Sequence, residues 1–290
     1  MKIAVTGSNG FLASYFRSYT NISNDEIIYL TTSIKNKKFS KTKKIIHCKP
    51  LYSDIEKKLR LQNIRTIIHF ASLIPKFFHD ADDRLFFNNI KMMNNLYKFS
   101  VKNNVKKFIY ISSFGSMDYP ENLDIKDFYT MSKVTGEHFC SIMNFKKIHA
   151  VSLRVSAPYG EYSKNKNVLN IFLDKALKRE DIIVYGKGTR EQNFTYAGDI
   201  VHAIELILKK KKISGTYNIT SNRNISMLNL AKLVKVITKS KSKIIFNNKK
   251  DPQENYRPKY NLKKAFKTFG YKSKFSLKDG LQKYIKWYLQ

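Results

Sequence analysis

A tyrosine and a lysine four residues apart on one helix can transfer a proton, and the chain contains three such pairs. They are Tyr129/Lys133, Tyr162/Lys166 and Tyr260/Lys264. A lysine near a phenol favours the phenolate and brings the pKa of the tyrosine toward neutrality. With 18 tyrosines and many lysines among 290 residues, chance alone gives about this number of pairs, so the spacing does not identify a site by itself.

The segment TGSNGFLA, residues 6–13, places two glycines between a strand-like run and a helical one. Gly7 permits a tight turn, and Gly10 lets a pyrophosphate approach backbone N–H groups at the start of the helix. This order of elements is typical of a dinucleotide phosphate site. The residues predicted to bind the dinucleotide here are Gly7, Asn9, Gly10, Phe11 and Leu12.

The end of the second strand-like run bears on which dinucleotide binds. An acidic residue at this position binds a free ribose 2′-hydroxyl, but the chain has Thr31, Thr32 and Ser33, followed by Lys35, Lys37 and Lys38. Hydroxyls and cations can hold a 2′-phosphate, although lysine is abundant everywhere in this chain. We therefore expect Thr31 and Ser33 to contact the cofactor. NADP(H) is the favoured cofactor, and NAD(H) is the alternative.

Position along the chain singles out the first tyrosine–lysine pair. Tyr129 begins a helical segment that follows a strand-like run ending in Ser112 and Ser113. Ligands of an open parallel sheet bind beyond the carboxyl ends of its strands, so Ser113 can meet Tyr129 over a bound nicotinamide. We predict that Tyr129 is the general acid/base and that Ser113 shares the hydrogen bonding to the reacting oxygen. Lys133 would hold the nicotinamide ribose and lower the pKa of Tyr129.

Strand-like and helical segments alternate through the first 160 residues. Nearly continuous apolar runs lie at 2–6, 27–30, 44–48, 66–70, 107–112 and 150–155, and helical spacing lies at 11–19, 54–61, 85–103 and 129–144. Such runs suit strands buried on both faces of a parallel sheet. The pattern predicts an α/β fold, a Rossmann doubly wound parallel sheet with a smaller C-terminal α/β substrate domain.

The rhythm changes after residue 160. We expect helices at 165–178, 227–238 and 277–289, strands at 181–186, 216–219 and 243–246, and a strand entering a helix at 193–210. The expected layout is a cofactor domain at 1–160, with a return near 193–221, and a domain at 161–290 that mostly binds substrate.

Several further segments match one family. They are IIHFAS (67–72), FFNNI (86–90), YISS (110–113), YTMSK (129–133), LRVSAPYG (153–160) and VYGKGTREQNFTYAGDIV (184–201). With the glycine loop, the chain resembles the extended short-chain dehydrogenase/reductase family, in its NAD(P)-dependent sugar-nucleotide epimerase/dehydratase branch, over nearly its whole length. The resemblance implies a nucleoside-diphosphate sugar substrate and a homodimer formed through the two long helices. It adds Ala71 and Asn89 to the cofactor-binding residues, and Ser156, Arg190 and Gln192 to the substrate-binding residues.

Departures from the family pattern bear on the type of reaction and on the residues that would bind the substrate. Family dehydratases carry an acidic pair directly after the strand-end hydroxyl residue, whereas Ser113 is followed by Phe114 and Gly115, so we do not expect dehydration. The family's substrate-binding asparagine aligns with Ala157, and the arginine of its RDF motif aligns with Gln192, which leaves Arg190 as the expected diphosphate contact.

Three functions remain from this sequence. The favoured one is reduction of a 4-keto (deoxy)sugar nucleotide, because no acid at the second strand holds NAD permanently. The alternative is an NAD-dependent nucleotide-sugar 4-epimerase, which needs the same Ser113, Tyr129 and Lys133. A dinucleotide-sensing regulator without enzymatic activity is less favoured, because a sensor does not need an acid/base group.

Charge is the unusual feature of the composition. The chain has 54 Lys+Arg against 22 Asp+Glu, a net charge of +32. Nucleic acid or an anionic membrane would suit such a charge, but the lysines are spread through every segment, which favours a solvated surface. We expect no specific nucleic-acid binding and no membrane span. Only two cysteines and no metal-binding histidine spacing point to reduced thiols, no metal and a cytoplasmic location.

Overall fold

The computed structural model describes residues 2–33, 44–75, 80–116, 127–164, 167–247 and 249–290. The chain divides into two compact units: unit 1 comprises residues 1–155 and 204–218, and unit 2 comprises 156–203 and 219–290. The sequence had suggested a boundary at 160 and a return near 193–221. Within the described ranges, no helix is both long enough and apolar enough to cross a membrane.

Unit 1 is built on a seven-stranded sheet, which confirms the predicted Rossmann-like parallel fold. Its strands are β1 (Lys2–Thr6), β2 (Ile27–Thr31), β3 (Lys44–His47), β4 (Ile64–His69), β5 (Lys107–Ser113), β6 (His149–Val155) and β11 (Gly215–Ile219). They lie in the order β11-β6-β5-β4-β1-β2-β3, and the pairs formed among β1 to β6 are parallel. The order reverses between β1 and β4, which is where sheets of this kind bind ligands.

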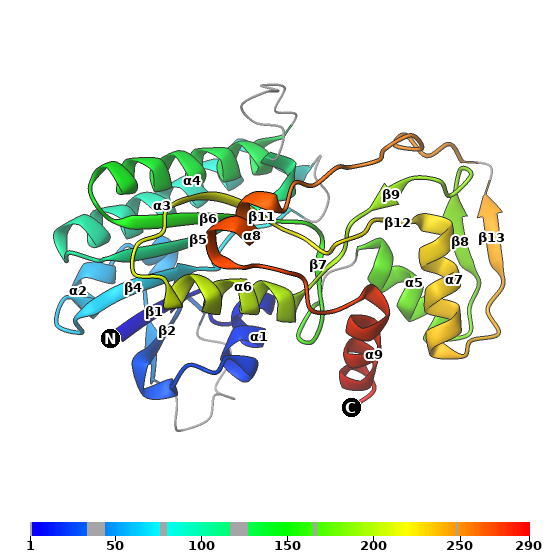
Figure 1. Cartoon of the computed structure of the whole chain (residues 1–290), viewed down its shortest axis with the longest axis horizontal. Coiled ribbons are helices and arrows are strands. Elements are labelled where there is room, and N and C mark those ends of the chain that lie inside the picture. Colours follow the sequence, from blue (N-terminus) through cyan, green and yellow to red (C-terminus); the bar gives the residue numbers. More distant parts are fainter. Residues whose placement is uncertain (1, 34–43, 76–79, 117–126, 165–166, 248) are drawn as a thin grey trace. The chain divides into compact units, whose positions relative to one another are not determined.

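Helices cover both faces of this sheet. They are α1 (Phe11–Tyr19), α2 (Ile55–Leu59), α3 (Asp83–Lys102) and α4 (Phe128–Phe145), with the short turns η1 (Asn24–Glu26), η2 (Pro50–Tyr52) and η4 (Phe114–Ser116). Figure 1 shows α3 and α4 side by side on one face of the sheet and α1 on the other. All the residues of β2 and β5 are buried, which explains their continuous apolar character.

Two side-chain contacts fix helices onto β5. A Cβ at Gly136 would lie 2.5 Å from Cζ of Tyr110, so glycine lets α4 approach the tyrosine ring closely. Lys107 donates from Nζ to the carbonyls of Ile207 (2.9 Å) and Leu208 (3.2 Å), at the end of α6 (Ala197–Lys209). This buried lysine thereby satisfies carbonyls that the end of a helix leaves without partners.

Unit 2 holds a smaller parallel pair, β8 (Ile182–Tyr185) and β13 (Ile244–Asn247), packed with α5 (Val168–Leu177) and α7 (Met227–Thr238). Two-residue strands pair β7 (Pro158–Tyr159) with β10 (Thr195–Tyr196), and β9 (Glu191–Gln192) with β12 (Ile225–Ser226). The remaining helices are α8 (Lys263–Phe269) and α9 (Leu277–Tyr288). The sequence patterns did not indicate α8, β7, β9 or β12, because such short elements show too little periodicity.

The two long helices of unit 1 keep apolar side chains in contact with solvent. On α4 these are Phe128, Met131, Ile142 and Phe145, and on α3 they are Phe87 and Val101. Phe145 is 85% exposed and Phe87 is 62% exposed. We call these six residues the α3/α4 apolar face; its positions on α4 follow the three- and four-residue spacing of one helix side.

Candidate active site

The glycine loop joins β1 to α1 in a conformation that requires glycine. Gly7 has a φ of +68°, and a Cβ there would lie 2.7 Å from the backbone nitrogen of Ala71. The hydroxyl of Tyr52 accepts a hydrogen bond from the Gly7 N–H at 2.8 Å, and the Gly10 N–H donates to the Gly7 carbonyl at 2.7 Å. The loop is therefore held against the residue that follows β4, as close packing at the ligand-binding edge requires.

The start of α1 fits a phosphate group. Side chains cap the starts of α3 and α4, where Asp82 accepts from Leu85 N and Asp127 accepts from Thr130 N. At α1 the N-cap is Gly10, and no side chain of the described residues caps it. Phe11 and Leu12 form the first turn, so their N–H groups suit an anionic ligand.

Two polar atoms beside this turn also fit a bound molecule. Ser8 Oγ and Asn9 Oδ1 are buried and have no hydrogen-bond partner within the described part of the chain. Buried polar atoms are almost always satisfied, so an unsatisfied pair next to a glycine loop suits a polar ligand. The loop residues therefore fit the phosphates of a dinucleotide.

The end of β2 is tied to the glycine loop. Asn9 donates from Nδ2 to Thr31 Oγ1 at 2.8 Å, and the same hydroxyl contacts the backbone N–H and carbonyl of Ser33. Thr31 is 2% exposed, whereas Ser33 is exposed. The lysines that we expected to assist a 2′-phosphate, Lys35, Lys37 and Lys38, lie outside the described residues.

The segment after β4 is held by Asn89 of α3. Its side chain accepts from the Leu73 N–H at 2.8 Å and donates to the Leu73 carbonyl at 3.0 Å. It also donates to Ser132 Oγ on α4 at 3.2 Å, and Ser132 in turn donates to the carbonyl of Tyr129. Asn89 thus joins the segment that contains Ala71 to the helix that carries the predicted acid/base. Its described contacts are with the protein, and its contact with a cofactor stays a prediction.

The structure brings the end of β5 and the start of α4 together. Ser113 Oγ accepts a hydrogen bond from the Gly115 N–H at 3.3 Å, and a Cβ on Gly115 would lie 2.9 Å from Thr130 Oγ1. Lys133 Nζ lies 5.4 Å from the centre of the Tyr129 ring and donates to the Ile111 carbonyl at 3.0 Å. Ser113, Tyr129 and Lys133 thus belong to one region of unit 1.

Proton affinities in this region differ from our expectation. Burial, with a smaller contribution from the Asp127 carboxylate, raises the pKa of Tyr129. Burial lowers the pKa of Lys133 to about 7, against the opposing effect of Glu137. The predicted lowering of the Tyr129 pKa is therefore wrong, because burial dominates and raises that pKa.

His69 at the end of β4 is a neutral packing residue. Burial, followed by the charge of Lys133, lowers the pKa of His69 to about 3. Its Nδ1 lies 2.8 Å from Thr6 Oγ1, and its ring stacks on Tyr110 with centroids 5.7 Å apart. A histidine that stays neutral at physiological pH does not act as a cation here. Among the described residues, no group of three or more His, Cys, Asp or Glu side chains is arranged to hold a metal ion.

The predicted substrate residues all lie in unit 2 and are engaged there in different ways. Ser156 is fully buried and donates to the Asn193 carbonyl at 3.0 Å. Arg190 forms an ion pair with Asp251, Nε to Oδ2 at 3.0 Å, and donates to Gln253 at 3.0 Å. Gln192 pairs with Ile225 through the β9–β12 ladder.

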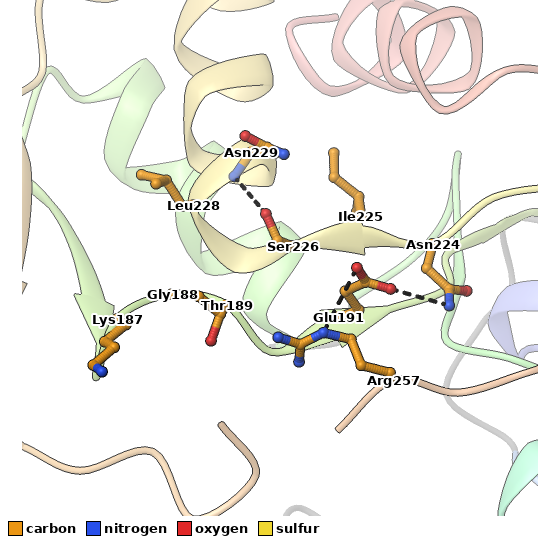
Figure 2. A pocket seen from close by; sticks show the side chains of 10 residues that line it. All are labelled: Lys187, Gly188, Thr189, Glu191, Asn224, Ile225, Ser226, Leu228, Asn229 and Arg257. Atoms are coloured by element: carbon orange, nitrogen blue, oxygen red, sulfur yellow. Dashed lines mark hydrogen bonds and ion pairs between the residues drawn. The ribbon is translucent and has the colours of Figure 1, made fainter. Parts of the chain in front are cut away.

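A cavity of about 400 Å³ lies nearby in unit 2, between the end of β8, the start of α7 and residue 257. Figure 2 shows two cations on its wall, Lys187 and Arg257, with Glu191 beside the arginine. Arg257 Nε is 3.7 Å from Glu191 Oε1, and its Nη1 donates to the carbonyls of Glu254 and Tyr256. Ser156, Arg190 and Gln192 do not line this cavity.

Residues 3–220 match the model of the NAD dependent epimerase/dehydratase family. The chain belongs to that family. This match confirms the resemblance of the sequence to the sugar-nucleotide epimerase/dehydratase branch of the extended short-chain dehydrogenase/reductase enzymes.

Relatives within the family differ in reaction. The chain is 28% identical to human dTDP-D-glucose 4,6-dehydratase, over 99% of this chain and 89% of that protein. It is 27% identical to Escherichia coli dTDP-4-dehydro-6-deoxyglucose reductase, over 77% of this chain and 75% of that protein. The fold is that of Thermotoga maritima UDP-glucose 4-epimerase with UDP-glucose (TM-score 0.83, 22% identity, 100% and 99% of the chains covered). The Thermus thermophilus UDP-glucose 4-epimerase complex with NAD is also similar (TM-score 0.82, 19% identity, 100% and 99% covered).

Several residues at these sites were not found from the sequence. Tyr52 contacts Gly7 across 45 residues, and Lys187 and Arg257 meet at one cavity from separate segments. Glu137 had a detectable signal, because it lies four residues after Lys133 and thus on the same side of the helix.

The lowered pKa of Lys133 predicts a pH-dependent stability. Lysine in the unfolded chain keeps a pKa near 10.5, so between pH 7 and that value the unfolded state binds more protons than the folded state. Stability from this group therefore rises with pH across that window. Between pH 7 and 9, urea unfolding of the cofactor-free protein should show a gain about 2 kcal/mol larger in the wild type than in Lys133→Met.

A matched control is Lys98→Met, which removes an exposed lysine of α3 and should keep the pH dependence of the wild type. Parallel stability curves for Lys133→Met and the wild type would show that Lys133 titrates alike in the folded and unfolded chains.

Proposed function

We propose that this family member reduces a 4-keto (deoxy)sugar nucleotide, with NADP(H) favoured as the cofactor. The observation that carries the proposal is the end of β2, where Thr31, Thr32 and Ser33 offer hydroxyls and no carboxylate. Without a carboxylate, nothing in this tripeptide repels a 2′-phosphate or binds both ribose hydroxyls as an acid does. A reductase exchanges its cofactor in each turnover, which suits weaker retention.

The residues after Ser113 support the same choice. Phe114 and Gly115 lie in η4 and carry no acidic or basic group that could protonate a leaving hydroxyl or remove a carbon-bound proton. Net elimination of water needs such groups, whereas reduction of a ketone needs a single proton donor. The chemistry proposed for this chain is therefore proton transfer by Tyr129 together with hydride transfer.

The roles of the three residues follow from their surroundings. The bound dinucleotide would supply the hydride. Tyr129, kept protonated by its raised pKa, would donate its phenolic proton to the oxygen of the reacting carbonyl. Ser113 would donate a hydrogen bond to that oxygen, and Lys133, which already donates to the Ile111 carbonyl, would use its remaining N–H groups to hold the nicotinamide ribose.

One observation favours the alternative, an NAD-dependent nucleotide-sugar 4-epimerase. The Thr31 hydroxyl is buried and bound to Asn9 and Ser33, so it offers little to a 2′-phosphate. An epimerase would use Tyr129 in both directions on a transient ketone. The dinucleotide-sensing regulator is disfavoured because the half-buried Tyr129 and the buried Lys133 lie together in a region suited to proton transfer.

A single assay separates these functions. With the purified chain, NADPH and a dTDP-4-keto-6-deoxy sugar, we expect loss of NADPH absorbance equal to the sugar reduced, and weaker activity with NADH. Interconversion of UDP-glucose and UDP-galactose without net cofactor consumption would instead establish the epimerase. Binding of the dinucleotide without turnover of either substrate would favour the regulator.

Tyr129→Phe tests the acid/base assignment in the same assay. The variant loses only a hydroxyl, so turnover should fall by about 10² or more while the dissociation constant of the cofactor changes little. Tyr162→Phe is the matched control, because Tyr162 belongs to one of the other two tyrosine–lysine pairs. Near-normal turnover by Tyr129→Phe would show that Tyr129 is not the general acid/base.

The nucleoside diphosphate of the substrate needs cations, and unit 2 offers two candidates. Arg190 was the sequence prediction, but the Asp251 carboxylate already neutralises it. The cavity of Figure 2 presents Lys187 and Arg257, with one acid, Glu191, on its wall. We propose this cavity for the nucleoside diphosphate, because its wall carries two cations and one acid, and the Arg257–Glu191 ion pair is longer (3.7 Å) than the Arg190–Asp251 pair (3.0 Å).

Substitution of each arginine distinguishes the two candidates. Arg257→Met should raise the calorimetric dissociation constant of UDP about tenfold or more, the usual loss of a charge-assisted hydrogen bond. Arg190→Met should lower thermal stability by freeing Asp251 but bind UDP nearly as the wild type does. Weaker UDP binding by Arg190→Met, with near wild-type binding by Arg257→Met, would instead indicate that Arg190 binds the diphosphate.

We also propose that two copies of the chain associate through the α3/α4 apolar face. Six apolar side chains exposed on two neighbouring helices favour burial against a second copy, as the family resemblance implied. Phe145→Lys should therefore convert a dimer to a monomer in sedimentation velocity. Leu61→Lys, an equally exposed position outside this face, is the control and should remain dimeric. A wild type that sediments as a monomer would disprove the association.

A further inference from the structure

A buried carboxylate lies directly beneath the proposed acid/base region and has no part in the chemistry described above. Glu137 of α4 is 7% exposed and lies one helical turn after Lys133. Arg154 of β6 pairs with it, with Nη2 at 2.7 Å from Oε2 and Nε at 2.9 Å from Oε1. A buried ion pair rarely adds much net stability, because both charges lose water, so its position needs a separate explanation.

The same carboxylate binds residues on either side of Ser113. Glu137 Oε1 accepts from Ser112 Oγ at 2.5 Å and from Ser116 Oγ at 3.0 Å. Ser116 Oγ is also 2.6 Å from the Ser113 carbonyl oxygen. Four elements, α4, β5, η4 and β6, therefore meet at one side chain. Hydrogen bonds to an ionised acceptor are among the stronger ones, so this contact restrains the backbone that carries Ser113.

Glu137 also affects Lys133 electrostatically. The groups that face Lys133 are Glu137 on its own helix, His69 at the end of β4, the Tyr110 ring at 5.2 Å and the Tyr129 ring at 5.4 Å. His69 is neutral at physiological pH and both phenols stay protonated, because burial raises the pKa of each. Glu137 is therefore the negative charge that opposes the loss of the lysine proton on burial.

We propose that Glu137 is a positioning residue that holds Ser113 on β5 and Lys133 on α4 in one arrangement and keeps a negative charge beside Lys133. The inference rests on the proposed function of this site but concerns residues that would not touch substrate or cofactor. Arg154 holds the Glu137 carboxylate in place, and the hydrogen bonds from Ser112 and Ser116 connect that carboxylate to the end of β5.

The test uses the pH dependence of cofactor binding. The dissociation constants of NADH and NADPH are measured by nucleotide fluorescence from pH 5 to 9 for the wild type and Glu137→Gln. Protonated Lys133 binds ribose oxygens better than neutral lysine, so affinity should fall as pH rises through its pKa. In Glu137→Gln this fall should move about one pH unit lower, because the neutral amide no longer opposes burial of the lysine charge.

Two further variants separate charge from geometry. The double variant Ser112→Ala/Ser116→Ala keeps the Glu137 charge but removes its contacts with the end of β5. It should lower turnover at least tenfold without changing the pH at which cofactor affinity decreases. Arg154→Lys should retain more turnover than Arg154→Met, since it keeps a cation beside Glu137. Glu205→Gln, which alters a carboxylate bound to Thr20 and Asn21, is the control and should match the wild type.

The outcomes distinguish this inference from the proposed function. A Glu137→Gln protein of reduced thermal stability whose cofactor binding has the wild-type pH dependence would show a structural role only and overturn the proposal. If Glu137→Gln fails to fold, Glu137→Asp, which keeps the charge on a shorter chain, should lose turnover without a pH shift, and unchanged turnover would overturn the proposal. If the wild type turns over neither sugar nucleotide, the proposed function fails, while the binding profiles still decide the role of Glu137.

Discussion

The parallel pairing of β1 with β2 and β4 is the constraint on which the rest of unit 1 depends. Parallel register brings the ends of these strands together, so that Thr6 is opposite His69 and their side chains are in contact. The glycine loop can then reach both neighbours, with Gly7 against Ala71 and Asn9 bonded to Thr31. A shift of one residue in either pair would separate these contacts and turn the strand-end side chains to the other face.

Burial sets the chemistry at the neighbouring strand. All seven residues of β5 are buried, and α4 packs closely on it because Gly136 leaves room for the Tyr110 ring. Removing water from Tyr129 and Lys133 favours the neutral form of both, so the site holds a protonated phenol and a lysine that loses its proton near pH 7. The negative charge of Glu137 opposes this loss of the lysine proton, so burial and charge pairing together set the pKa of Lys133.

The sequence predicted those features that depend on local pattern. Apolar runs indicated the strands, and Gly7 and Gly10 indicated the tight loop between β1 and α1. The order of elements indicated that the end of β5 and the start of α4 lie together. Features that depend on long-range packing were not predictable. The contact of Tyr52 with Gly7 comes from a turn with positive φ angles at Leu51 and Tyr52, and the pairing of Arg190 with Asp251 joins residues far apart in the chain. The direction of the Tyr129 pKa shift depends on burial, which cannot be predicted from the spacing of tyrosine and lysine.

The distribution of charge shows why the net value of +32 says little about function. Among the described residues, Lys107 and Lys133 are the lysines classed as buried, and each has a local reason for its position. Lys107 donates to carbonyls at the end of α6, and Lys133 donates to Ile111 beside the charge of Glu137. Exposed lysines are solvated and screened by salt, so the net charge that they add does not by itself indicate a partner. The charges that decide what unit 1 can do are the few that the fold has removed from water. Carbonyls accept from Lys107 and Lys133, and Arg154 pairs with Glu137.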